Sequence, residues 1–175
     1  MSTALIILTL NEIDGVKNIL PKIDQKLVDE ILVVDGGSTD GTIEHVKKLG
    51  FKIIIQSIKG HGGAILTGIQ NTKSDKIVIF GPDGNHDVNE IEQLIKKIDE
   101  GFDQVVISRF EKGSINLDAG KIDTFGNKMF TFFANLFFRG NLTDSLNESR
   151  IITRDAFNEL KFEPCGLDST YQMSI

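Results

Sequence analysis

A single carboxylate, Asp83, follows an apolar run in the stretch IVIFGPDGNH, residues 77–86. A continuous apolar run is typical of a buried parallel strand, and the Gly and Pro residues around Asp83 indicate a turn at its end. Because ligands of open α/β sheets bind beyond the carboxyl ends of the strands, Asp83 is a candidate for chemistry. The alternative is that Asp83 and Asn85 only cap a turn or the next helix.

Other segments repeat this order of strand, turn and helix. Strands are predicted over residues 4–10, 30–35, 51–56, 77–80 and 104–108, with a short one at 149–153, and helices over residues 13–23, 39–49, 64–71 and 88–100. Such alternation favours an α/β, Rossmann-like fold with a mostly parallel central sheet and helices on both faces. The strand ends then share one edge, where five charged residues are expected to converge: Glu12, Asp35, Lys59, Asp83 and Arg109.

Composition limits the classes of function. The 175 residues suffice for one domain, 1–175, and the net charge of -6 argues against nucleic acid as a partner. The lone Cys165 cannot form an internal disulfide. Without a secretory leader or an apolar run long enough to span a bilayer, the chain is expected to be cytoplasmic or peripheral to a membrane. The last ten residues predict the start of a helix that the end of the chain cuts off.

A helix predicted over residues 121–139 contains six of the twelve phenylalanines. At about 100° per residue it has two faces. The apolar face comprises Ile122, Phe125, Met129, Phe130, Phe132, Phe133, Leu136 and Phe137, and the polar face comprises Asp123, Thr124, Asn127, Lys128, Thr131 and Asn135. Two interpretations are open. The apolar face packs on the sheet, or residues 122–138 lie at a membrane surface, where Lys121, Lys128 and Arg139 meet anionic headgroups.

Glycines, carboxylates and cations at one edge of a sheet suit a nucleotide diphosphate. Glycines let the backbone approach phosphate oxygens, carboxylates bind a divalent ion or a ribose hydroxyl, and Lys or Arg offsets the charge of a leaving diphosphate. Neither the dinucleotide fingerprint nor a P-loop follows any predicted strand. His45, His61 and His86 are too scattered for a zinc site, although His86 is a candidate substrate contact.

Several motifs follow one another along the chain. They are LTLNE (8–12), VVDGGSTDGT (33–42), KGHGGAILTG (59–68), SD (74–75), GPDGNH (81–86) and SR (108–109). In this order they resemble family-2 glycosyltransferases of the GT-A fold, and among them the dolichol-phosphate (polyprenyl-phosphate) mannosyl- and glucosyltransferases. The resemblance implies inverting transfer of a hexose from a GDP-mannose or UDP-glucose type of donor to a polyprenyl or dolichyl phosphate, with Mg²⁺ or Mn²⁺ as cofactor.

The resemblance also implies roles for individual residues. Nucleotide-sugar binding falls to Thr9, Asn11, Glu12, Asp35, Lys59, Pro82 and Asp83, metal binding to Asp83 and Asn85, contact with the acceptor phosphate to Arg109, Lys121 and Arg150, and catalysis to Asp83 and Arg109. A phosphate acceptor needs no general base, because its second pKa is about 6 and it is already a nucleophile near neutral pH.

The sequence departs from the family pattern where a metal would bind. Gly81 stands in place of the first acid of the D-x-D motif, and Glu148 and Ser149 replace Gly and Phe in the late D…S-G-F-R motif, here DSLNESR. Loss of a carboxylate is expected to weaken the metal site, since Mg²⁺ usually relies on one or two carboxylates plus phosphates. Two alternatives stay open, a soluble acceptor and a non-catalytic nucleotide-sugar-binding module.

Overall fold

The computed structural model describes residues 1–84, 86–108, 121–138, 143–145, 147–164, 169 and 172–173, without the side chains of residues 121–125 and 138. The strands are β1 (Thr3–Thr9), β2 (Glu30–Asp35), β3 (Lys52–Ile55), β4 (Lys76–Phe80), β5 (Gln104–Val106) and β6 (Arg150–Thr153). The α-helices are α1 (Ile13–Ile19), α2 (Thr42–Lys48), α3 (His61–Gln70), α4 (Asn89–Ile98), α5 (Lys121–Phe138) and α6 (Arg154–Glu159), and short 3-10 helices span Leu20–Lys22 and Gln25–Leu27. The predicted order of strands and helices is confirmed.

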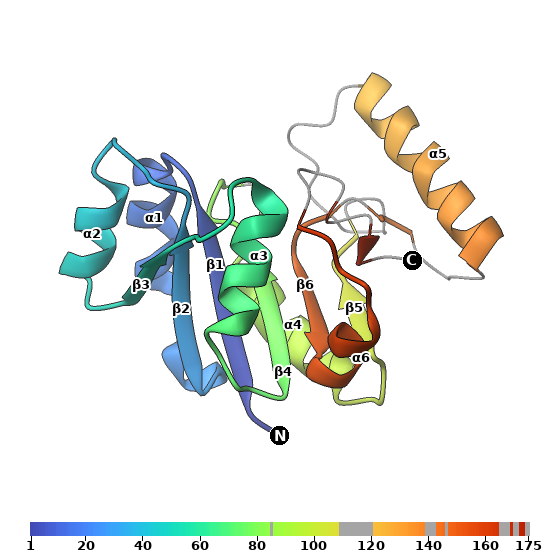
Figure 1. The fold of residues 1–175 in the computed structure, drawn as a ribbon, viewed down its shortest axis with the longest axis horizontal. Coiled ribbons are helices and arrows are strands. Elements are labelled where there is room, and N and C mark those ends of the chain that lie inside the picture. The colour runs from blue at the N-terminus through green and yellow to red at the C-terminus, as the bar shows by residue number, and fades with distance from the viewer. Residues whose placement is uncertain are drawn as a thin grey trace.

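These strands form one sheet in the order β3-β2-β1-β4-β6-β5 (Figure 1). β1 pairs in parallel with β2 and β4, and β2 pairs in parallel with β3. β6 is antiparallel to both of its neighbours, β4 and β5. The prediction of a mostly parallel sheet is therefore confirmed, with β6 reversed. Because β6 runs the other way, its first residues lie at the edge of the sheet where the other strands end.

Helices cover both faces of the sheet, as predicted. On one face, α1, α2 and α4 share a core with Leu5 and Ile7 of β1. On the other face, α3 and α6 share a core with Ile6 and Leu8. Successive side chains of a strand point to opposite faces, so a strand buried on both sides is apolar at every position. This two-sided core holds the ends of β1, β2 and β4 in fixed register.

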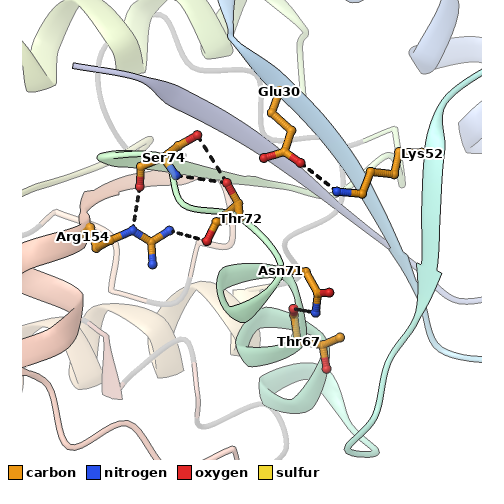
Figure 2. A network of polar contacts seen from close by, with 7 residues as sticks. All are labelled: Glu30, Lys52, Thr67, Asn71, Thr72, Ser74 and Arg154. Atoms are coloured by element: carbon orange, nitrogen blue, oxygen red, sulfur yellow. Dashed lines mark hydrogen bonds and ion pairs between the residues drawn. The ribbon is translucent and has the colours of Figure 1, made fainter.

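Polar contacts tie together the opposite edge of the sheet, away from the strand ends. Arg154 donates from Nε to the carbonyl of Ser74 at 2.7 Å and from Nη2 to the carbonyl of Thr72 at 3.1 Å (Figure 2). Lys52 Nζ lies 2.9 Å from Glu30 Oε1 and joins β3 to β2. The hydrogen bond from Lys52 lowers the pKa of Glu30. These residues stabilise the fold at a distance from the candidate site.

Helix α5 presents its aromatic face to solvent. The exposed side chains are Met129, Phe130, Phe132, Phe133, Leu136 and Phe137, and their exposed fractions run from 39% for Phe133 to 70% for Phe137. Asn127 and Thr131 of the polar face are instead buried, at 5% and 6% exposure. The interpretation that the apolar face packs on the sheet is therefore wrong for the described residues, and α5 lies away from the sheet (Figure 1).

Asn127 and Thr131 of the polar face are buried because they bind other polar groups. Asn127 Nδ2 donates to Asp144 Oδ1 at 2.7 Å, and the backbone N–H of Ser145 donates to Thr131 Oγ1 at 3.1 Å. Buried polar groups that are hydrogen-bonded in this way avoid the cost of desolvation. Among the described residues, no helix combines the length and the apolar character that crossing a bilayer requires.

Candidate functional site

Asp35 organises the turn that follows β2. Its Oδ1 accepts hydrogen bonds from the backbone N–H groups of Gly37 at 2.8 Å and Ser38 at 2.7 Å. Its Oδ2 accepts from the hydroxyls of Thr9 at 2.8 Å and Ser38 at 2.7 Å. Since a carboxylate offers about four lone-pair sites, these bonds occupy the acceptor capacity of this fully buried residue. Asp35 thus joins the ends of β1 and β2, and its contact with a base or ribose stays a prediction.

The turn after β1 is bonded to the same region. Asn11 has a φ of 56°, in the left-handed region that Asn tolerates better than most residues. Its backbone N–H donates to Ser38 Oγ at 2.7 Å, and its Oδ1 accepts from the N–H of Thr39 at 2.9 Å. The N–H of Glu12 donates to Thr42 Oγ1 at 3.0 Å. The two turns therefore form one bonded unit, which fixes the backbone of Glu12.

The turn after β4 packs on the first residues of α1. A Cβ on Gly15 would lie 2.0 Å from the carbonyl oxygen of Pro82 and 3.4 Å from Glu12 Oε2, so this approach requires glycine. Pro82 is buried, whereas Asp83 is exposed. The contact with Gly15 therefore positions the loop that carries Asp83 beside Glu12.

Negative charge gathers where these turns meet. Partial burial, followed by the charges of Asp83, Asp40 and Glu148, raises the pKa of Glu12. The pKa of Glu12 is raised because the neighbouring carboxylates repel its charged form, and such an acidic group attracts cations. Among the described residues, no three His, Cys, Asp or Glu side chains are gathered closely enough to hold a metal ion.

Glu148 joins this acidic group from the residues that precede β6. His61, the first residue of α3, has its Nε2 3.4 Å from Glu148 Oε1. Sequence reasoning assigned no role to either residue. In the sequence, Glu148 is noticeable only because it replaces the Gly of the late family motif. Glu148 lies near the end of β4 because β6 pairs antiparallel with β4, and no local sequence pattern indicates that pairing.

His86 packs under the loop that carries Asp83. Its ring centroid lies 5.7 Å from that of Phe80, and its Nδ1 lies 3.1 Å from Glu90 Oε2. Burial alone would lower the pKa of His86, but the hydrogen bond with Glu90 and the charges of Glu90, Asp83 and Glu148 outweigh it and raise that pKa. Its contact with a substrate stays a prediction.

Arg150 lies in β6 with no exposed surface. Its Nη2 donates to the carbonyl oxygen of Asn147. Complete burial lowers the pKa of Arg150 to about 10, while the charges of Glu148 and Asp144 oppose that shift. This placement does not support the predicted contact with an acceptor phosphate, because a phosphate arriving from solvent finds no surface of Arg150.

The remaining predicted site residues are described only in part. Lys59 is exposed in the segment between β3 and α3. Arg109 and Asn85 lie outside the described residues, as does the side chain of Lys121. The roles assigned to these residues stay predictions.

The chain is similar in sequence to known glycosyltransferases. The family model described as Glycosyl transferase family 2 matches residues 4–161. The chain is 25% identical over 175 residues to Glycosyltransferase AglJ of Haloferax volcanii, with 95% of this chain and 55% of that protein covered. It is 33% identical over 121 residues to the dolichol-phosphate mannosyltransferase of Pyrococcus furiosus, with 65% of this chain and 34% of that protein covered. The chain thus spans 55% or less of the length of these two relatives.

A solved structure has the same fold. The glucosyl-3-phosphoglycerate synthase of Mycobacterium tuberculosis, in complex with Mn²⁺, UDP-glucose and phosphoglyceric acid, matches with a TM-score of 0.76 and 22% sequence identity. The match covers 98% of this chain and 63% of that chain. The predicted GT-A fold is confirmed by this similarity.

Proposed function

The chain belongs to glycosyl transferase family 2, and on this basis we propose that it transfers a hexose from a nucleotide-diphosphate sugar to a polyprenyl phosphate, with inversion at the anomeric carbon. Donors of the GDP-mannose and UDP-glucose types both fit the proposal. The relative from Pyrococcus is named a dolichol-phosphate mannosyltransferase, and the mycobacterial structure contains UDP-glucose. We assign the donor and acceptor sites to one GT-A domain, residues 1–175.

In this proposal the donor binds where β1, β2 and β4 end. The bonded turns around Asp35 and Asn11 provide a preorganised surface, and Glu12 and Asp83 contribute carboxylates. A diphosphate and an acidic group repel each other, so they are compatible with a cation between them. The oxygen donors present fit Mg²⁺ or Mn²⁺, which Asp83 and Asn85 would hold. When bound, the cation offsets the charge of the leaving diphosphate.

The observation that supports a lipid acceptor is the solvent-exposed aromatic face of α5. Phe133 and Phe137 stack with ring centroids 6.0 Å apart, and Phe132 packs edge-on against Phe133 at 5.6 Å. A helix with such a face and an exposed basic residue, here Lys128, is suited to the boundary between headgroups and acyl chains. The chain is proposed to be cytoplasmic and to meet the membrane through residues 122–138.

The same helix is connected to the donor edge through its inner face. Thr131 bonds to Ser145, and Ser145 precedes Glu148 by three residues. We propose that a membrane in contact with the outer face of α5 brings the acceptor phosphate toward the donor edge. We assign contact with the acceptor phosphate to Arg109 and Lys121.

The experiment follows sugar transfer and vesicle binding together. The chain is incubated with radiolabelled UDP-glucose or GDP-mannose, Mn²⁺, and phosphatidylglycerol vesicles that contain a polyprenyl phosphate. We expect label in the lipid fraction with one of the two donors. Phe137→Ser is expected to lower both vesicle binding and transfer, whereas Phe102→Ser, an exposed phenylalanine between α4 and β5, is expected to change neither.

The alternatives predict different results. If the protein transfers the sugar to a soluble molecule, and Phe137→Ser does not change the rate of that transfer, the natural acceptor is soluble. Nucleotide binding without transfer to any acceptor would favour a non-catalytic nucleotide-sugar-binding module.

A further inference from the structure

Two departures from the family pattern, Gly81 and Glu148, lie against each other. β4 and β6 are antiparallel, with Ile79 opposite Arg150. Continuing that register by two residues sets Gly81 opposite Glu148. Residues directly opposite each other in an antiparallel pair point to the same face. The side chain of Glu148 therefore points to the face to which a side chain at position 81 would point.

The carboxylate of Glu148 fills the space in front of Gly81. A Cβ at position 81 would lie 3.2 Å from Oε2 and 3.3 Å from Oε1 and Cδ of Glu148. These distances are shorter than ordinary van der Waals contacts between carbon and its neighbours. A side chain at position 81 would therefore require the carboxylate of Glu148 to move by a few tenths of an ångström. The carboxylate at this point comes from the β6 side of the sheet instead of from β4.

The same carboxylate belongs to the acidic group that contains Asp83. The charges of both Glu148 and Asp83 act on Glu12 and on His86. His61 Nε2, 3.4 Å from Glu148 Oε1, flanks the carboxylate on one side, and the buried Arg150 interacts with its charge on another. Glu148 is therefore held at the donor edge by neighbours from α3 and β6.

We infer that Glu148 replaces the missing first acid of the D-x-D motif and supplies a carboxylate to the divalent cation that accompanies the nucleotide diphosphate. The inference rests on the proposed function, because it concerns the cation of the donor site. Cations of this kind rely on one or two carboxylates together with phosphates, so an acid from the β6 side restores the pair that Gly81 breaks. Glycine at position 81 leaves this space to the carboxylate of Glu148.

Binding of Mn²⁺ tests the inference without turnover. The electron paramagnetic resonance signal of free Mn²⁺, titrated with the protein in the presence of GDP or UDP, gives the Kd of the ion. Glu148→Gln keeps the shape of the side chain without its charge and is expected to raise this Kd about tenfold or more, the loss found even for outer-shell partners of metal ligands. Glu92→Gln, exposed on α4, is the matched control and is expected to leave the Kd unchanged.

A double variant tests whether a carboxylate at position 81 can replace the one at position 148. Gly81→Asp combined with Glu148→Gly returns the acid to β4 and is expected to recover most of the Mn²⁺ affinity that Glu148→Gln loses. Thermal unfolding of each variant shows whether the protein is folded. Equal Mn²⁺ affinity of the wild-type protein and a folded Glu148→Gln would overturn the inference and leave the proposed function standing. A wild-type protein that binds neither nucleotide with Mn²⁺ would overturn the metal-dependent function, and the inference with it.

Discussion

Replacing Gly15 by alanine is expected to displace the loop that carries Asp83. The new Cβ would lie 2.0 Å from the carbonyl oxygen of Pro82, whereas unstrained contacts between carbon and a carbonyl oxygen begin at about 3.3 Å. The loop or α1 must therefore move by about 1 Å. Overpacking of this kind costs about 1–3 kcal/mol of stability. Misplacement of a reacting group by about 1 Å can lower activity about 100-fold, so the effect on the site is expected to exceed the effect on the fold.

Substitutions at two other glycines serve as controls, because they change the stability of the fold without moving the loop that carries Asp83. A Cβ on Gly68 would lie 2.6 Å from Ile6 Cγ2 in the core, so Gly68→Ala is expected to lose about 1–3 kcal/mol without moving the Asp83 loop. A Cβ on Gly126 of α5 meets nothing within 4 Å. Because alanine is favoured over glycine inside a helix by about 1 kcal/mol, Gly126→Ala is expected to be at least as stable as the wild-type protein.

Urea denaturation measures the stability of the three glycine variants, and titration with GDP or UDP and Mn²⁺ measures the site. We expect Gly15→Ala and Gly68→Ala to lose similar stability, and Gly15→Ala alone to lose nucleotide affinity and transfer activity. If Gly15→Ala is destabilised but binds nucleotide as the wild-type protein does, then α1 moves instead of the loop. That result would refute the proposal that Gly15 positions the loop of Asp83.

Two further predictions concern contacts away from the donor. Asn127→Ala removes the amide that donates to the buried Asp144 and is expected to lower the free energy of unfolding by about 1–3 kcal/mol, measured in urea, whereas Asn18→Ala on the surface of α1 should change it little. Lys52→Met removes the hydrogen bond that lowers the pKa of Glu30. A carboxylate with a lowered pKa stabilises the fold above its unfolded value of 4.5, and this contribution is lost as the pH falls through the folded pKa. The variant is therefore expected to be about 0.2–1 kcal/mol less stable than the wild-type protein at pH 7, and this difference is expected to shrink as the pH falls below 4.5. A difference in stability that does not vary with pH would contradict the assignment.

The order of strands and helices could be predicted because the strands are buried on both faces. β1 and β4 are almost uniformly apolar and end at turns, which is a local property of the sequence. The direction of β6 was not predictable in this way. Its antiparallel pairing with β4 and β5 joins segments that lie more than 40 residues apart, and its composition is equally compatible with either direction.

The helix after β2 begins later than predicted because the buried carboxylate of Asp35 binds the residues that precede it. A helix is predicted over residues 39–49, but the hydroxyl and the N–H of Ser38 both donate to Asp35, and α2 begins only at Thr42. Asn11, which precedes α1, likewise does not cap that helix, because its side-chain oxygen accepts from the N–H of Thr39. Hydrogen bonds to a charged acceptor are stronger than those between neutral groups, so Asp35 determines where Ser38 binds.

The helical wheel of α5 identified two faces but could not show which one is buried. Apolar faces are usually buried, and that expectation fails here because Asn127 and Thr131 have partners in Asp144 and Ser145. Those partners come from a segment that a wheel does not include. The burial of a polar face depends on such partners, and they are visible only in the tertiary structure.

The short segment between α5 and β6 connects the two halves of the proposed reaction. Asp144 and Ser145 hold the inner face of α5, whose outer face is proposed to meet the lipid. Three residues after Ser145, Glu148 places its carboxylate in front of Gly81, at the edge proposed for the donor. Because only two residues separate Ser145 from Glu148, we expect docking of α5 on a membrane to affect the position of Glu148.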